Sequence, residues 1–126
     1  MEEKITILYV DDEFINLQVF IAVLKKKFNI ITASSGMEAL EILENNNKIK
    51  IVISDMQMPE MNGMEFINHA RKKNYEVIYF IFTGFEISDE ITEALKNKII
   101  KNYFRKPIDK DVIEKSLLKE IDKLVN

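Results

Sequence analysis

Five short runs rich in β-branched and aromatic residues recur along the chain. The runs at 5–10, 50–54 and 77–82 are apolar along most of their length and do not alternate with polar residues. Such runs are typical of strands that other elements cover on both faces, as in a parallel sheet. Two further runs, at 28–33 and 102–104, complete a set of five predicted strands.

The segments between these runs place apolar residues three and four positions apart, which predicts amphipathic helices. Ser34 or Ser35, Asn62 and Ser88 stand where side chains cap helix starts, and the lysines at 25–27 suit a helix end. The predicted inward-facing residues are, along the chain, Leu17, Phe20, Val23 and Leu24; Met37, Leu40 and Leu43; Phe66, Ile67 and Ala70; Ile91 and Leu95; and Val112, Ile113, Leu117, Ile121 and Leu124.

Strand and helix therefore alternate five times. This order predicts an α/β fold, a doubly wound parallel sheet of five strands with helices on both faces and right-handed crossovers. In such folds the chemistry lies at the carboxyl ends of the strands. The 126 residues suit one domain, residues 1–126.

Composition narrows the classes of function. Eighteen basic and 21 acidic residues give a net charge of −3, which disfavours nucleic-acid binding driven by bulk charge. A sequence without cysteine excludes disulfides, thiolate zinc sites and cysteine nucleophiles. No apolar run approaches the roughly 20 residues that span a bilayer, and the N-terminus lacks the pattern of a signal peptide. We expect a cytoplasmic protein that binds neither nucleic acid directly nor a membrane.

Charged and hydroxyl side chains gather at the ends of the predicted strands. Asp11 and Asp12 follow the first strand, Asp55 ends the third, Thr83 follows the fourth and Lys106 follows the fifth. Clustered carboxylates stay ionised at neutral pH only beside a compensating cation, and oxygen ligands favour Mg²⁺, with Mn²⁺ as a substitute. A carboxylate so held can attack phosphorus, while a lysine and a hydroxyl stabilise the transferring group. The pattern predicts that Asp55 accepts a phosphoryl group.

Four motifs, in this order and spacing, make the chain resemble the receiver domain of two-component response regulators over essentially its whole length. The motifs are YVDDE at 9–13, SDMQMPEMNG at 54–63, FTG at 82–84 and YFRKP at 103–107. The resemblance implies a flavodoxin-like sheet with strand order 2-1-3-4-5. It also implies a signalling domain, similar to the chemotaxis regulators, that catalyses only its own phosphorylation and dephosphorylation. The phosphodonor would be a sensor histidine kinase or a histidine phosphotransfer protein.

The resemblance assigns the metal and the acceptor to particular residues. It implies that Asp55 is the phospho-acceptor and that Mg²⁺ is held by Asp11, Asp12, Asp55 and the main-chain carbonyl of Gln57. The peptide bond at 106–107 is commonly cis in this family, despite the general preference for trans. Lys106–Pro107 is therefore a candidate cis peptide.

The resemblance also implies a switch. Phosphate on Asp55 would draw in the Thr83 hydroxyl, and Tyr103 would follow into the vacated space. The face formed by residues 87–97 and 103–125 would then shift, biasing a two-state equilibrium that already exists. This face is the expected surface for a partner or for a homodimer.

Some positions are expected to set the dephosphorylation rate, and others depart from the residues usual in the family. Gln57 and Phe85 occupy the positions that set the dephosphorylation rate in the family. Because Phe85 cannot orient a water by hydrogen bonding, we expect a long-lived phosphoryl group. Gly84 stands where the family usually has alanine, Ile99-Ile100 replaces a common Gly-Ala pair, and Ile108 replaces a common phenylalanine. The first two departures fall in the region that carries the signal.

Several residues have simpler interpretations. Asp11 and Asp12 alone could be an acid pair favoured at a helix start. His69, the only histidine, could relay phosphate, although a solvated helix position accounts for it, and the lysines at 25–27 are typical of a solvated helix end. Met56, Met58, Met61 and Met64 could bind Cu(I), but methionine is also an adaptable core residue, and we expect these four to pack beneath the acceptor.

Two other classes of function compete with the phospho-acceptor. One is an interaction module that uses the same fold without phosphorylation. The other is a small enzyme, such as a Mg²⁺-dependent phosphatase or a flavin protein. The sequence contains no GxxxxGK[ST] loop and no glycine-rich turn after the first strand, and the acidic loop there would repel a nucleotide phosphate unless a metal intervened.

Overall fold

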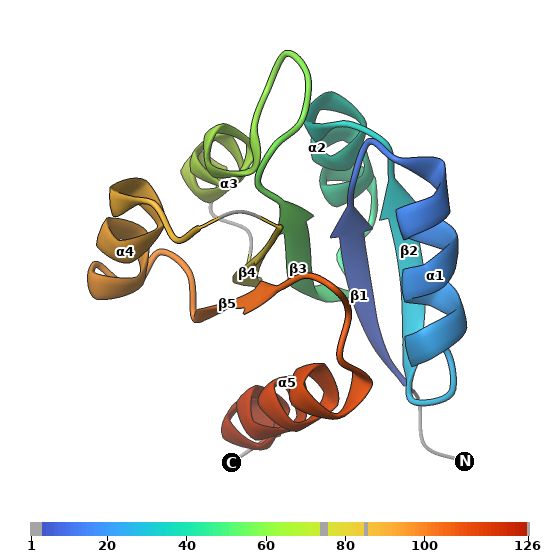
Figure 1. Ribbon diagram of the computed structural model, residues 1–126. Coiled ribbons are helices and arrows are strands. Elements are labelled where there is room, and N and C mark those ends of the chain that lie inside the picture. The colour runs from blue at the N-terminus through green and yellow to red at the C-terminus, as the bar shows by residue number, and fades with distance from the viewer. Residues whose placement is uncertain (1–3, 74–75, 85, 126) are drawn as a thin grey trace.

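The computed structural model describes residues 4–73, 76–84 and 86–125. Strands and helices alternate along the chain (Figure 1). The strands are β1 (Ile5–Val10), β2 (Phe28–Ala33), β3 (Ile49–Asp55), β4 (Ile78–Thr83) and β5 (Asn102–Arg105). The helices are α1 (Phe14–Leu24), α2 (Gly36–Asn45), α3 (Gly63–Lys72), α4 (Asp89–Lys96) and α5 (Lys110–Val125).

The five strands form one parallel sheet in the order β2-β1-β3-β4-β5. This confirms the predicted fold class and strand order. Because all strands run the same way, their carboxyl ends meet at one edge of the sheet. The central strand β3 has two neighbours, and its residues Ile51, Val52 and Ile53 are fully buried. Burial on both faces explains why this strand reads as an apolar run.

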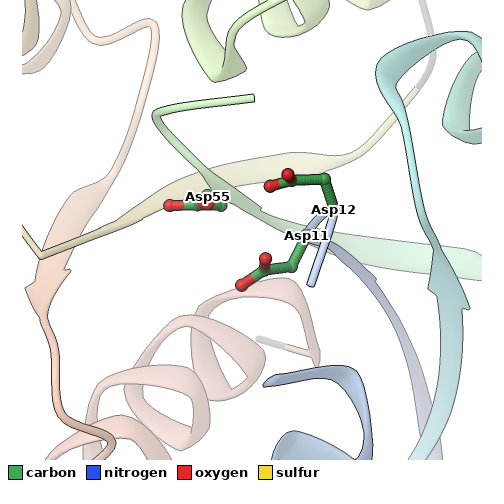
Figure 2. Close-up of side chains that lie close together, drawn as sticks. All are labelled: Asp11, Asp12 and Asp55. Carbon is green, nitrogen blue, oxygen red and sulfur yellow. The ribbon is translucent and has the colours of Figure 1, made fainter. Parts of the chain in front are cut away.

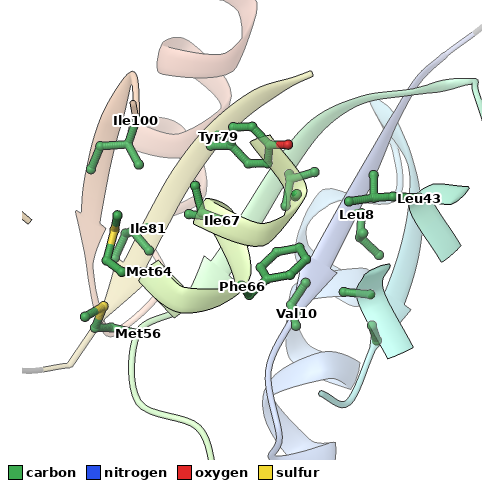
Figure 3. Close-up of a cluster of buried hydrophobic side chains, with 14 of the residues drawn as sticks. Leu8, Val10, Leu43, Met56, Met64, Phe66, Ile67, Tyr79, Ile81 and Ile100 are labelled. Carbon is green, nitrogen blue, oxygen red and sulfur yellow. The ribbon is translucent and has the colours of Figure 1, made fainter. Parts of the chain in front are cut away.

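Two hydrophobic clusters hold the helices to the sheet, one on each face. Helices α2, α3 and α4 cover one face, where residues such as Leu8, Val10 and Phe66 pack together (Figure 3). Helices α1 and α5 cover the other face, where Tyr9, Phe20 and other aromatic side chains dominate. Alternate residues of a strand therefore pack into the clusters on opposite faces of the sheet, because successive side chains of a strand point to opposite faces.

Side-chain caps begin three helices where the sequence predicted them. The Ser35 hydroxyl accepts the Glu38 N–H of α2 at 3.0 Å, and the Ser88 hydroxyl accepts the Ile91 N–H of α4 at 3.2 Å. Asn62 forms a capping box with Glu65 at the start of α3. Each cap satisfies a backbone donor that the first turn of a helix leaves without a partner.

The turn after α4 takes a form that usually contains glycine. The Lys98 N–H donates to the Leu95 carbonyl and the Ile99 N–H to the Ala94 carbonyl, at 3.1 and 2.8 Å. This pair of bonds is a Schellman motif, in which the residue at the turn adopts the left-handed conformation. Lys98 adopts it with φ of 61°, so a side chain with a Cβ stands where glycine is preferred.

Some predicted inward-facing residues lie elsewhere. Met37 is 59% exposed and Val112 is 54% exposed, so both predictions were wrong. In α2 the buried stripe contains Gly36, Ala39 and Leu43. Met37 is the residue next to Gly36 in the sequence and therefore faces another side of the helix. The buried stripe of α5 contains Ile113 and Leu117, and the neighbouring Val112 faces solvent.

Five other helix residues complete the comparison with the predicted stripes, and two of them, Val23 and Leu40, are half-buried. Leu95 is half-buried, with Ala94 as the buried neighbour that the prediction omitted. Ile121 is also half-buried and packs against the cluster beneath α1 and α5. The side chain of Leu124 lies outside the described part of the structure. Among the described residues, no helix combines the length and the apolar character that crossing a bilayer needs.

Candidate functional site

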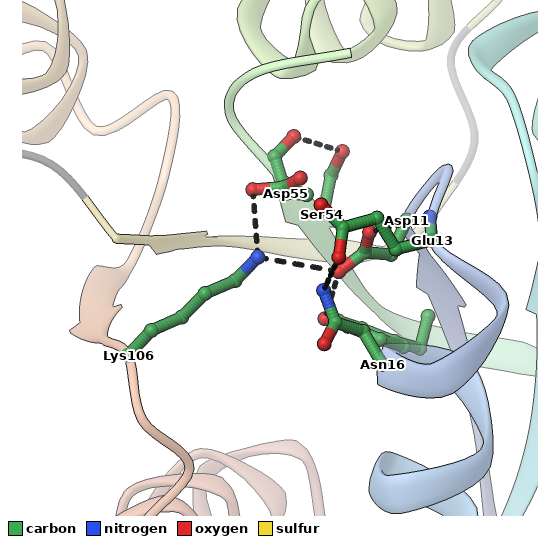
Figure 4. A network of polar contacts seen from close by, with 7 residues as sticks. Asp11, Glu13, Asn16, Ser54, Asp55 and Lys106 are labelled. Carbon is green, nitrogen blue, oxygen red and sulfur yellow. Dashed lines mark hydrogen bonds and ion pairs between the residues drawn. The ribbon is translucent and has the colours of Figure 1, made fainter.

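The sheet brings the predicted site residues to one edge. Asp55 is the last residue of β3 and Thr83 the last of β4, while Asp11 follows β1 and Lys106 follows β5. Parallel pairing extends past β1, because the Asp11 N–H donates to the Ala33 carbonyl at 3.1 Å. Figure 4 shows the side chains of Asp11, Asp55 and Lys106 converging from three different segments.

Three carboxylates form an acidic cluster at this edge. Asp11, Asp12 and Asp55 each offer an oxygen, and these oxygens all lie within 4.8 Å of one another (Figure 2). Asp11 is fully buried and Asp55 is 6% exposed, whereas Asp12 is exposed. The cluster therefore has two buried carboxylates and one carboxylate that faces solvent. Hard oxygen ligands in this number fit Mg²⁺, which binds through a few carboxylates and keeps several waters.

Lys106 supplies a positive charge to the cluster. Its Nζ lies 3.2 Å from Oδ1 of Asp55 and 3.3 Å from Oδ2 of Asp11. The backbone N–H of Lys106 donates to the Thr83 carbonyl at 2.8 Å, which ties the β5–α5 loop to the end of β4. The Lys106–Pro107 peptide is cis, as predicted. The ammonium also lies 5.6 Å from the centroid of the Phe82 ring.

The charges at the site shift the pKa values of two of its members. Burial raises the pKa of Asp55 to about 6, the Asp11 charge adds to the rise, and Lys106 opposes it. Burial also acts to lower the pKa of Lys106, but the charges of Asp55 and Asp11 outweigh it and leave the pKa of Lys106 raised. With three carboxylates and one ammonium, the site formally lacks two positive charges, which a divalent cation would supply.

A hydroxyl that the sequence reasoning missed also contacts the acidic cluster. Tyr9 donates its phenolic O–H to Oδ2 of Asp11 at 2.7 Å, and the Glu13 N–H donates to Oδ1 at 3.0 Å. Burial and the adjacent Asp11 charge raise the pKa of Tyr9 well above its ordinary value, so the phenol remains a donor. The sequence held one signal, since Tyr9 and Asp11 are two positions apart and share one side of an extended segment.

The predicted switch residues lie on neighbouring strands. Thr83 is 1% exposed and follows Phe82, whose Cα pairs with that of Asp55 in the β3–β4 register. Tyr103 is half-buried on β5, pairs with Ile81 of β4, and packs against the cluster beneath α2, α3 and α4. The hydroxyl and the aromatic residue therefore occupy the β4 and β5 side of the site.

The loop from β3 to α3 is held close to the acceptor. The Gly63 N–H donates to the Met56 carbonyl at 2.9 Å, and a Cβ at Gly63 would overlap the Asp55 carbonyl oxygen. Ser54 donates its hydroxyl to that same oxygen at 2.9 Å. Gln57, the predicted carbonyl ligand, stands in this loop with an exposed side chain. Only glycine at 63 permits the loop to pack this tightly.

The methionines of this loop pack as predicted. Met56 and Met64 are buried, and Met58 and Met61 are half-buried against the same hydrophobic cluster. Figure 3 shows Met56 and Met64 beside Ile81. These side chains support the loop from below. His69 and the lysines at 25–27 are exposed, in keeping with their simpler interpretations.

An apolar surface adjoins the open side of the site. A cavity of about 460 Å³ opens beside Lys106 and is lined by Asn16, Val19, Phe20, Phe82, Gly84, Lys106, Pro107 and Ile108. On the same helix as Asn16, the side chains of Phe14 and Ile15 are 71% and 72% exposed. Phe85, the second predicted rate-setting residue, lies outside the described residues.

Comparisons with known proteins agree with this geometry. A family model described as the response regulator receiver domain matches residues 7–118. A chemotaxis protein CheY homolog of Campylobacter jejuni is 35% identical over 91 residues, which cover 71% of this chain and 69% of that protein. A solved response regulator receiver domain protein from Clostridium thermocellum is 31% identical, with a TM-score of 0.85 over 96% of this chain and 98% of that one.

Other relatives are much longer proteins. The hydrogenase transcriptional regulatory protein HoxA of Cupriavidus necator is 27% identical over 106 residues. The match covers 84% of this chain but 22% of that protein. The chain thus spans about a fifth of this regulator, and over two thirds of the chemotaxis protein.

Proposed function

This chain belongs to the response regulator receiver domain family of two-component systems, and from that premise we propose that it accepts a phosphoryl group on Asp55. The observation that carries the proposal is the contact of Lys106 with two carboxylates, 3.2 Å from Asp55 and 3.3 Å from Asp11, within the acidic cluster. A nucleophile, a cation and a metal-ligating cluster at one edge form the set that phosphoryl transfer requires.

Three residues of the chain have different roles in the proposed phosphoryl transfer. One Asp55 oxygen attacks phosphorus, and Lys106 and the Thr83 hydroxyl stabilise charge on the phosphoryl oxygens. As the bond between Asp55 and phosphorus forms, the bond from phosphorus to a histidine nitrogen of the donor breaks, and the imidazole leaves with that electron pair. The product is an acyl phosphate. The domain catalyses its own phosphorylation and dephosphorylation and acts on no other substrate.

Mg²⁺ is the proposed cofactor, and Mn²⁺ its substitute. Asp11, Asp12, Asp55 and the main-chain carbonyl of Gln57 would hold it. The cation, when bound, neutralises the acceptor carboxylate and the phosphoryl oxygens. The three clustered carboxylate oxygens support this assignment. Burial, and after it the charge of Asp11, raises the pKa of Asp55, and a bound cation would offset both effects.

The proposed donor is a sensor histidine kinase or a histidine phosphotransfer protein. A protein donor must approach through the open side of the site. The side chains of Phe14 and Ile15 are exposed, and a cavity opens beside Lys106. These features support a protein as the phosphodonor, because a small-molecule donor would leave this apolar surface exposed to water. We place these events in the cytoplasm and in one domain of residues 1–126, with no direct nucleic-acid contact.

Phosphorylation would then change the face formed by α4, β5 and α5. Thr83 would move toward the phosphoryl group, Tyr103 would follow into the space that Thr83 vacates, and the face would shift within a two-state equilibrium. This face is the proposed surface for an output partner or a homodimer. Gln57 and Phe85 would set the lifetime of the phosphoryl group, and a Phe85→Glu variant is expected to dephosphorylate faster because a carboxylate can orient water.

Intact-mass spectrometry tests the proposal directly. The wild type and the Asp55→Asn variant are incubated with phosphoramidate, with and without Mg²⁺. One phosphoryl adduct that requires Mg²⁺ and is lost in the variant is the expected result. An unmodified wild type, with Mg²⁺ binding verified and a phosphohistidine donor protein also tried, would instead favour an interaction module that is never phosphorylated.

A further inference from the structure

Tyr9 is a fully buried residue whose polar atom points into the acidic cluster. It lies on β1, on the same side of the strand as Asp11, and its hydroxyl donates to Oδ2 of Asp11 at 2.7 Å. Buried tyrosines usually direct the hydroxyl to a partner. Here the partner is one of the proposed metal ligands, which a packing role alone would not require.

Aromatic neighbours fix the ring that carries this hydroxyl. The Tyr9 ring stacks on Phe20 of α1, with centroids 3.9 Å apart and ring planes 5° apart. On β4, Phe82 meets the ring at 6.1 Å and 55°. A ring held between two elements cannot turn its hydroxyl away from Asp11 without disturbing the core. The hydroxyl is therefore placed by the fold.

The bonds of Asp11 leave it little freedom. Its Oδ2 accepts from Tyr9 and from Lys106, and its Oδ1 accepts from the Glu13 N–H. A carboxylate offers about four acceptor sites, so one remains, on Oδ1. Two of these donors, Tyr9 and the Glu13 N–H, come from close by in the sequence, whereas Lys106 belongs to a separate loop and also serves Asp55.

We propose that Tyr9 is a positioning residue that orients the Asp11 carboxylate toward a divalent cation and keeps it oriented when Lys106 turns to the phosphoryl group. This inference rests on the proposed function. A phosphoryl group on Asp55 offers Lys106 new anionic partners, and Asp11 then loses one of its two donors at Oδ2. The Tyr9 hydroxyl remains, so the buried carboxylate does not become unpartnered at that oxygen. Residues that hydrogen-bond metal ligands typically change affinity by 10–100-fold when removed.

The Tyr9→Phe variant isolates the hydroxyl, because it keeps the ring and its stack on Phe20. Isothermal titration calorimetry with Mg²⁺ measures the affinity of wild type and variant. We expect the dissociation constant to rise by about tenfold, the lower end of the range for such residues. Tyr79→Phe is the matched control, since Tyr79 is a buried tyrosine in the cluster on the opposite face of the sheet. Its Mg²⁺ affinity should equal that of the wild type.

A double-mutant cycle separates positioning from general packing. Phe20→Leu removes the stacking partner of Tyr9 and should weaken Mg²⁺ binding only while the Tyr9 hydroxyl is present. In the Tyr9→Phe background the same change should leave the affinity unaltered. Equal losses in both backgrounds would overturn the inference. Circular dichroism of all variants in EDTA checks that each one folds.

The outcomes distinguish this inference from the function on which it rests. If the wild type binds Mg²⁺ and Tyr9→Phe binds it equally well, the positioning role is wrong and the proposed function stands. If the wild type fails to bind Mg²⁺, both are overturned. A ¹³C-tyrosine NMR spectrum adds a reading independent of phosphorylation, because the Tyr9 ring signal next to the oxygen should shift on Mg²⁺ addition.

Discussion

The ammonium of Lys106 lies 3.2 Å from Oδ1 of Asp55 and compensates the acceptor charge before any metal arrives. The metal and the lysine therefore repel each other across shared ligands. We expect Lys106→Met to bind Mg²⁺ about tenfold more tightly, a change of about 1.4 kcal/mol. Lys106→Arg keeps the charge and serves as the control. Calorimetric titration measures both, and an unchanged or weaker affinity in Lys106→Met would contradict the idea.

The raised pKa of Asp55 predicts a pH-dependent stability for the metal-free protein. The carboxyl has a pKa of about 6 in the folded chain and about 3.9 in an unfolded one. Between these values the folded state binds more protons, so the free energy of unfolding falls as the pH rises from about 4 to about 6. Above pH 6 the full cost is present. A pKa difference of about 2 corresponds to about 3 kcal/mol, and screening by water at the open side of the site reduces this to on the order of 1–2 kcal/mol.

Asp55→Asn isolates this effect, since it replaces the acid with a neutral side chain of the same shape. In EDTA the variant should be more stable than the wild type at pH 7 and nearly equal to it at pH 4. Urea unfolding at several pH values measures the difference. Saturating Mg²⁺ should narrow the gap at pH 7, because the wild type, with one more carboxylate ligand, gains more from the cation than the variant does. A gap that does not change with pH would refute the assignment.

Gly63 and Gly36 are a matched pair, because each is the first residue of its helix. A Cβ at Gly63 would overlap the backbone carbonyl of Asp55, which cannot move aside, whereas one at Gly36 would meet the flexible Met61 sulfur at 2.6 Å. We expect Gly63→Ala to cost about 2–3 kcal/mol of stability and Gly36→Ala to cost less than about 1 kcal/mol. Chemical denaturation compares them, and equal costs would show that the close approach is unimportant.

Lys98 offers a stabilising change. Its left-handed φ of 61° strains any residue with a Cβ, and glycine removes that strain. We expect Lys98→Gly to raise the free energy of unfolding by about 0.5–1 kcal/mol. Lys98→Ala also removes the charge but keeps the Cβ, so it should bring no gain. Thermal and urea unfolding of the three proteins decide the matter, and a gain in Lys98→Ala would point to charge as the cause.

The sequence predicted the strands and the edge where the charged residues meet, because apolar runs such as 77–82 end on chemically active side chains. It failed at Met37 and Val112, where a large apolar residue stands one helical step from the buried stripe. Small residues such as Gly36 and Ala39 carry that stripe in α2, and periodicity gives them little weight.

The hydrogen bond from Tyr9 to Asp11 could not be predicted from the sequence, for a different reason. The position of the hydroxyl depends on Phe20, which comes from α1 and packs on the Tyr9 ring. Local spacing places Tyr9 and Asp11 on one side of a strand, but the packing of α1 against that strand decides whether their polar atoms meet. Contacts of this kind arise from tertiary structure.

The strand β5 is a short edge strand of four residues that pairs with β4 alone, whereas the other edge strand, β2, has six. Edge amides with few neighbours open locally without unfolding the whole domain. In a hydrogen–deuterium exchange experiment, β5 should therefore exchange before β1, β3 and β4. Tyr103 thus belongs to a short edge strand that we expect to open more easily than β1, β3 and β4, so the proposed signal would pass through an easily deformed part of the sheet.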